Sequence, residues 1–263
     1  MSVRDGSKPV TGLAAADFVL TDNDVPQQIQ AFSSADIPVD VTLIVNTSGS
    51  RTAVAEQLDK DVQQIERLLR RDDALRLLRI DTFVEDLRPM TPVGSRAAIR
   101  VVPRRAGAAS VHDALLAALV QPVAPDRHHL VVAITDALDT ISVTTADRLR
   151  EIASRSEALL QVVSVRTASP YRPAFVRPPF DDQDLLTLSE AAERTGGELR
   201  SPNLFADPDL VSAFKRVFDE FRQSYLLRYS PRNVDAAGWH EIVVSIPRLP
   251  TVAIHTRRGY YGS

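Results

Sequence analysis

The strongest constraint on the fold is a boundary at residue 46, where a mostly apolar run ends and small polar residues begin. Residues 39–45 predict a strand. The next five residues read Asn-Thr-Ser-Gly-Ser, and an amphipathic helix is predicted from Thr52. Open α/β sheets form ligand sites at the carboxyl ends of their strands. The sequence therefore predicts an α/β domain with a polar site at the end of this strand.

The alternation of strand and helix patterns continues to residue 222. Besides 39–45, strands are predicted at 75–83, 129–135, 159–165 and near 197–201, with an edge strand over 86–92. Helices are predicted at 52–70, 95–102, 111–120, 144–156, 184–195 and 207–222. This order favours right-handed crossovers and a doubly wound, mainly parallel, Rossmann-like sheet.

The two ends of the chain have a different pattern of short strands and turns. Neither residues 1–36 nor residues 223–263 contain enough apolar side chains to form a core alone. Because chain termini often lie close together, we expect them to form one small β module, with an α/β domain of residues 37–222 inserted between its halves. Two independent β extensions are the alternative. The proline-rich segment 166–183 is predicted to be a long loop, and its role is left open.

Composition excludes several classes of protein. The 263 residues carry a formal net charge of −3, which predicts no general attraction to nucleic acid. The absence of cysteine excludes disulfides and cysteine-ligated zinc, and the five histidines lack the spacing of a zinc hydrolase. No apolar run is long enough to span a membrane, so no direct membrane insertion is expected. No signal peptide is recognisable at the start of the sequence.

Common catalytic motifs are missing around the polar segment. A nucleophile elbow and the glycine patterns of nucleotide-binding loops are absent, so no enzymatic activity is predicted. His240 is interpreted as a half-buried strand residue rather than a base. The helix start near Ser50 could also hold an anion, an alternative ranked below protein binding. The basic residues between 96 and 105 are interpreted as a solvated helix face.

Three sequence motifs resemble one protein family along essentially the whole chain. Residues 5–13 read DGSKPVTGL and are followed by Asp17-Phe18, residues 225–231 read YLLRYSP, and residues 257–260 read RRGY. Together with the strand–polar–helix boundary, these motifs resemble bacterial proteins related to the von Willebrand factor A domain. The resemblance implies an α/β fold with flanking β segments and an exported protein, periplasmic or secreted, whose signal peptide is absent here.

The resemblance also implies a metal-ion-dependent adhesion site. Its first motif, Asp-x-Ser-x-Ser, falls on Asn46, Ser48 and Ser50, so an amide stands where the family has a carboxylate. Its last aspartate falls on Asp136. Hard divalent cations need oxygen ligands and negative charge, and one lost charge at about 4 Å removes roughly 4 kcal/mol of attraction at an effective dielectric near 20. A degenerate site is therefore expected, with Ser48, Ser50 and Asp136 as the remaining candidate metal ligands.

Other positions of the site also depart from the family pattern. The family's threonine falls on Ala109, with Ser110 as the neighbouring hydroxyl, and its final glycine falls on Ala137. Asp139 lies close by and is expected to contribute charge. The predicted partner-binding residues share one edge of the sheet; they are Asn46, Thr47, Ser48, Ser50, Ala109, Ser110, Asp136 and Asp139.

These observations predict a non-enzymatic, adhesion-like module that binds a protein partner at the carboxyl edge of the sheet. No cofactor is expected, and a weakly bound Mg²⁺, Mn²⁺ or Ca²⁺ is the alternative. A structural scaffold with a vestigial metal site is the second reading. The sequence does not identify the partner, the oligomeric state or the pathway.

Overall fold

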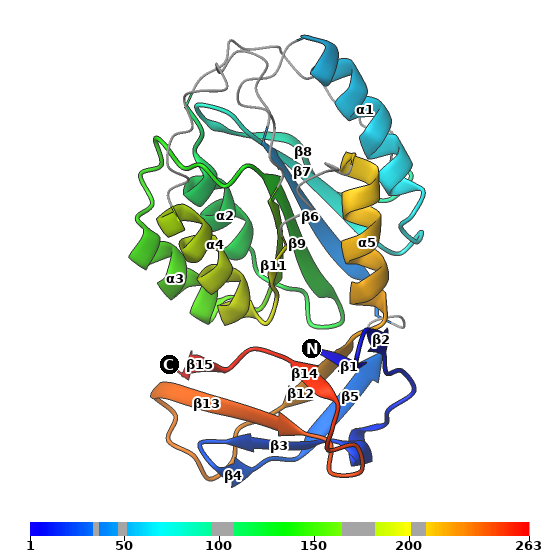
Figure 1. Ribbon diagram of the computed structural model, residues 1–263, viewed down its shortest axis with the longest axis vertical. Helices are drawn as coiled ribbons and strands as arrows, with labels where there is room; N and C mark the ends of the chain where they lie inside the picture. The colour runs from blue at the N-terminus through cyan, green and yellow to red at the C-terminus, as the bar shows by residue number, and fades with distance from the viewer. Residues whose placement is uncertain (34–36, 47–51, 96–107, 165–181, 201–208, 263) are drawn as a thin grey trace.

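A six-stranded sheet forms the centre of the larger part of the molecule (Figure 1). The computed structural model describes residues 1–33, 37–46, 52–95, 108–164, 182–200 and 209–262. The strand order is β11-β10-β9-β6-β7-β8, with β8 antiparallel to β7 and every other pair parallel. The strands are β6 (Val39–Asn46), β7 (Ala74–Ile80), β8 (Val84–Pro92), β9 (His128–Thr135), β10 (Leu159–Ser164) and β11 (Leu199–Arg200). The predicted α/β fold with a mostly parallel sheet is confirmed.

Helices cover both faces of this sheet, because each presents one apolar stripe. On one face lie α1 (Thr52–Glu66) and α5 (Leu210–Arg222). On the other lie α2 (Val111–Leu119), α3 (Ala146–Arg155) and α4 (Asp182–Thr195). The predicted stripe of the first helix is confirmed, since Leu58, Val62 and Ile65 are buried against the sheet.

Most differences from the sequence prediction concern the ends of elements. The second predicted strand ends at residue 80, because the main chain of Asp81 bonds to that of Phe83 and turns the chain back into β8. β8 is longer than predicted, with nine residues, and the first helix ends at residue 66 rather than 70. Nearly all of the predicted helix at 95–102 and of the loop at 166–183 lies outside the described residues.

Short strands from both ends of the chain pair with one another below the α/β domain (Figure 1). β5 pairs with β12, β1 with β14, and β3 with β13, each time in antiparallel orientation. The bounds are β1 (Ser2–Asp5), β2 (Lys8–Pro9), β3 (Val19–Asp22), β4 (Val25–Pro26), β5 (Ile29–Ser33), β12 (Tyr225–Tyr229), β13 (Gly238–Ser245), β14 (Ala253–His255) and β15 (Gly259–Gly262), with a short 3-10 helix at Ala15–Asp17. We call this assembly the β module; the domain limits at residues 36 and 222 stay a prediction.

A buried carboxylate lies at the centre of the β module. Asp22 has no solvent exposure and accepts hydrogen bonds from the hydroxyls of Tyr229 and Tyr260, at 2.9 and 3.0 Å. His240 Nδ1 lies 2.8 Å from its other oxygen. His240 is thus fully buried, with 1% exposure, rather than half-buried as the sequence suggested. His240 is buried because it takes part in this polar network, whose members come from β3, β12, β13 and β15.

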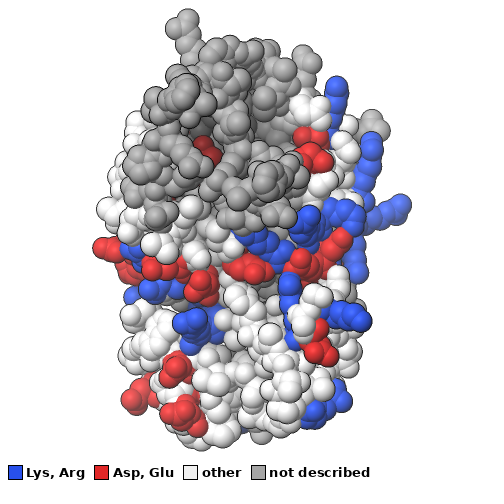
Figure 2. Space-filling view, in the orientation of Figure 1, with Lys and Arg blue, Asp and Glu red and all other residues white. Residues whose placement is uncertain are grey.

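Polar contacts attach the β module to the α/β domain. The guanidinium of Arg257 donates to the carbonyls of Ser154 and Ser156 at the carboxyl end of α3, where a cation interacts favourably with the helix dipole. Glu220 of α5 accepts from Arg4 of β1 and from Arg200. On the face of the molecule shown in Figure 2, charged side chains gather in a belt across the middle, whereas much of the β module below it is uncharged.

No helix in the described ranges is long and apolar enough to cross a membrane.

Two histidines of β9 make stability depend on pH. Burial lowers the pKa of His128 to about 3 and that of His129 to about 4, whereas both are near 6.5 in an unfolded chain. Below 6.5 the unfolded state therefore binds protons that the folded state does not, and the unfolding free energy falls. We expect each histidine to remove about 1.4 kcal/mol between about pH 7.5 and about pH 5.5, measured by urea unfolding.

A control separates the two histidines. The ring of His128 packs on Phe221, so His128→Phe keeps the aromatic contact and should remove about half of this pH dependence. If the unfolding free energy of His128→Phe depends on pH as strongly as that of the natural chain, the assignment of half of this dependence to His128 is contradicted.

Candidate functional site: the carboxyl edge of the sheet

The structure brings Asn46 and Asp136 into direct contact. Asn46 is the last residue of β6 and Asp136 follows β9, and these neighbouring parallel strands end at the same edge of the sheet. Asn46 Nδ2 donates to Asp136 Oδ1 at 2.8 Å and to Thr135 Oγ1 at 3.2 Å. The two positions therefore lie together as the resemblance implied, but an amide–carboxylate hydrogen bond joins them.

Thr47, Ser48 and Ser50 lie outside the described residues. Their predicted roles, including metal ligation by the two serines, stay predictions. Among the residues that the structure does describe, no group of three or more histidine, aspartate or glutamate side chains is arranged to hold a metal ion.

Ala109 and Ser110, two of the predicted partner-binding residues, are buried. They are 4% and 3% exposed. The main chain of Ala109 exchanges hydrogen bonds with Thr140, and the hydroxyl of Ser110 donates to the main-chain oxygen of Asp81. These bonds fix the loop before α2 against β7 and the segment after β9, which withdraws both side chains from solvent.

Asp139 has a structural task at this edge. Its Oδ1 accepts from the main-chain nitrogens of Val111 and His112 at 2.7 and 3.1 Å, and also from the hydroxyl of Ser142. The first nitrogens of a helix lack partners within the helix, and a carboxylate there also interacts favourably with the helix dipole. Asp139 therefore caps α2, and this oxygen is engaged by three donors instead of facing a cation.

Ala137 has a backbone conformation that normally favours glycine. Its φ is +68°, and its side chain is 1% exposed. A left-handed conformation costs a residue with a Cβ roughly 1–2 kcal/mol. The residues on either side hold it in place, since the nitrogen of Ala137 donates to Thr135 Oγ1 and that of Leu138 to Asp136 Oδ1. The family's tight bend is therefore kept here without its glycine.

Exposed apolar side chains lie around the same edge, and the sequence analysis did not identify them. Phe83 follows β7 and is 67% exposed, and Val143 follows β9 and is 90% exposed. Ile141 and Leu186 are about half exposed on the loop before α3 and on the first turns of α4. The loop before α3 is attached to the start of α2, because the carboxylate of Asp113 accepts hydrogen bonds from the main-chain nitrogens of Val143 and Thr144. For Ile141 and Val143, apolar residues between a predicted strand and a predicted helix were the available signal, whereas Phe83 and Leu186 fell inside a predicted strand and a predicted helix.

The cap on α2 can be tested by mutation. Asp139→Ala removes the partner of two helix nitrogens and should lower the unfolding free energy by about 2 kcal/mol. Asp147→Ala is the matched control, because this first-turn carboxylate of α3 is 95% exposed and forms only a surface ion pair with Arg150, so its loss should change stability by less than about 0.5 kcal/mol. Equal effects of both variants in urea unfolding would contradict the assigned cap.

Neither a protein-family model nor a curated protein matches this sequence. Several solved structures are similar. A von Willebrand factor type A protein from Catenulispora acidiphila is 13% identical, with a TM-score of 0.48 over 84% of this chain and 50% of that one. An aerotolerance-related membrane protein from Bacteroides fragilis is 13% identical, with a TM-score of 0.46 over 70% of this chain and 99% of that one.

A third similar structure is the manganese-loaded TRAP protein of Plasmodium vivax, which is 15% identical, with a TM-score of 0.41 over 87% of this chain and 97% of that one. Similarity at these levels does not extend to ligands or activity. The mostly parallel six-stranded sheet, with helices on both faces, agrees with the α/β fold that the resemblance seen in the sequence implied.

Proposed function

We propose that this chain is a non-enzymatic protein-interaction module that docks a partner at the carboxyl edge of its sheet without a structural cation. The observation that carries this proposal is the 2.8 Å hydrogen bond from the Asn46 amide to the Asp136 carboxylate. In an adhesion site with a carboxylate at both positions, two like charges at this separation need a cation between them. The neutral amide donates its own hydrogen and removes that need.

The neighbouring residues support a site that works without metal. The threonine position is a buried alanine at residue 109, which has no side-chain oxygen. One oxygen of Asp139 is occupied by the start of α2. The resulting degenerate adhesion site keeps its shape through hydrogen bonds. The TRAP structure was determined with manganese; for the present chain we propose no cofactor, with weak binding of Mg²⁺, Mn²⁺ or Ca²⁺ as the alternative.

The docking face that we propose consists of the exposed apolar residues at this edge. Phe83, Ile141, Val143 and Leu186 come from separate loops and a helix start that surround the ends of the strands. A partner docked at this edge would cover these exposed apolar side chains. We propose a protein as the partner, no nucleic acid, and a location outside the cytoplasm. A scaffold domain with a vestigial site is the second candidate.

Divalent-ion titration tests the absence of a structural cation. The melting temperature of the natural chain should not change in millimolar Mg²⁺, Mn²⁺ or Ca²⁺, because a ligand stabilises a fold only when it binds the folded state. Asn46→Asp should lower stability by roughly 2 kcal/mol in chelator, since it replaces a charge-assisted hydrogen bond with carboxylate repulsion. Added Mn²⁺ should restore much of this loss.

Asp136→Asn is the matched control for this experiment. It keeps an amide–amide hydrogen bond with Asn46 and removes the charge, so it should remain insensitive to cations. A natural chain whose melting temperature rises with Mn²⁺, and which loses that response in Asp136→Asn, would show a working metal site and overturn the proposal.

Site-specific photo-crosslinking tests the docking face. A photoreactive phenylalanine at position 83 or 143 should give the same adduct with one protein when the chain is expressed in its native host. Met90 and Val120 are exposed apolar residues toward the opposite edge of the sheet, and the same replacement there should give no such adduct. The scaffold candidate is favoured if positions 83 and 143 give no adduct, or only the products that positions 90 and 120 give.

A further inference from the structure

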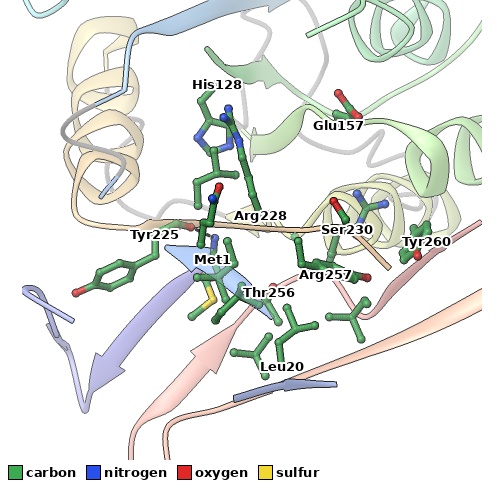
Figure 3. A pocket seen from close by; sticks show the side chains of 18 of the residues that line it. Met1, Leu20, His128, Glu157, Tyr225, Arg228, Ser230, Thr256, Arg257 and Tyr260 are labelled. Atoms are coloured by element: carbon green, nitrogen blue, oxygen red, sulfur yellow. Dashed lines mark hydrogen bonds between the residues drawn. The ribbon is translucent and has the colours of Figure 1, made fainter. Parts of the chain in front are cut away.

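A cavity of about 1240 Å³ lies between the β module and the amino ends of strands β9 and β10 (Figure 3). Every residue of β12, from Tyr225 to Tyr229, lines it. Leu20, Ile242 and Val244 of the β module line one side, and His128 of β9 lines the other. β12 therefore borders an open space, and in its sheet it pairs with β5 on one side, so its other edge is a position at which a further strand can pair.

Among the described residues, partners for the outer edge of β12 occur at its first residue alone. The main-chain nitrogen and oxygen of Tyr225 exchange two hydrogen bonds of 2.8 Å with those of Met1, so they point away from β5. Along an antiparallel strand every second residue points to the same side, and the register with β5 shows no irregularity. The main-chain groups of Leu227 and Tyr229 therefore also point outward, and within the described part of the chain they have no hydrogen-bond partner.

The two faces of this open edge differ in chemistry. Tyr225 and Leu227 face the apolar core of the β module, where Leu20 and Val244 line the cavity. Arg228 alternates with them and faces His128 on the other side (Figure 3). His128 Nδ1 is buried and has no partner in the ranges described. The charged residues that line the cavity are Arg127, Arg228, Arg232, Arg257 and Glu157, so positive charge predominates.

We propose that the open edge of β12 binds an extended segment of a partner protein as an additional antiparallel strand. Residues that pair directly in an antiparallel ladder share one face of the sheet. The segment would therefore carry apolar residues opposite Leu227 and Tyr229 and an acidic residue opposite Arg228. Main-chain bonds supply the affinity and the alternating side chains supply the specificity, as in other cases of strand addition.

This interface is separate from the one under Proposed function. The cavity borders the amino ends of the strands, whereas Asn46 and Asp136 lie at their carboxyl ends. A result for one surface therefore does not decide the other.

A short synthetic peptide provides the test. The probe is an acetylated and amidated pentapeptide with Thr, Val, Glu, Val and Thr in that order, titrated into the ¹⁵N-labelled full chain. The amide signals of Leu227 and Tyr229 should shift in a saturable way, and that of Asn46 should not. N-methylation of the peptide amides that point toward β12 should weaken binding at least about tenfold, since each lost hydrogen bond is worth about 1 kcal/mol. N-methylation on the opposite edge should have little effect.

A charge exchange gives the second arm. Arg228→Glu should bind the peptide with Lys in place of Glu more tightly than the original peptide, which reverses the natural preference. If this variant does not fold, the peptide titrations of the natural chain, including those with the N-methylated peptides, still test the proposal. Absence of shifts at Leu227 and Tyr229 at millimolar peptide, or equal binding of both N-methylated peptides, would overturn the proposal.

Discussion

One carboxylate without contact to solvent holds the two ends of this chain together. Burying a charge costs several kcal/mol unless hydrogen bonds replace its hydration. Asp22 receives these bonds from Tyr229, Tyr260 and His240, which belong to three strands of the carboxyl-terminal segment. Burial is also the main reason why the pKa of Tyr229 is raised, so this phenol remains a donor. The β module also contains a small apolar core around Val3 and Phe18.

At the edge of the larger sheet an amide–carboxylate hydrogen bond joins Asn46 and Asp136, which lie at the ends of adjacent strands. Under the proposed function, the amide hydrogen takes the role that a cation has in an adhesion site. Ala137 keeps a left-handed bend although it carries a Cβ, and Asp139 joins the bend to α2. Hydrogen bonds thus tie the bend after β9 to the start of α2.

Much of the α/β domain could be predicted because its signals are local. Val131 to Ile134 form an uninterrupted apolar run, which indicates a strand covered on both faces, and Leu58, Val62 and Ile65 recur at helical spacing. The family resemblance implied that positions 46 and 136 lie together, and the pairing of β6 with β9 accounts for it. Element ends were less certain, because turns such as the one at Asp81 depend on main-chain bonds that leave little trace in composition.

Contacts between distant residues could not be predicted in the same way. Asp22 and His240 are 218 positions apart, and nothing local marks either of them as buried. Ala109 and Ser110 were assigned to a binding surface because the motif position was visible in the sequence while the burial of the loop was not. The cavity beside β12 is formed by residues from both ends of the chain and from its middle, so it exists only after the segments have assembled.

The insertion of the α/β domain between β5 and β12 also has a mechanical consequence. The two strands that lead into and out of that domain are antiparallel neighbours paired over five residues. Both ends of the described chain lie within the β module (Figure 1). The chain therefore enters and leaves the α/β domain at one place, and the β5–β12 ladder fastens the entry to the exit.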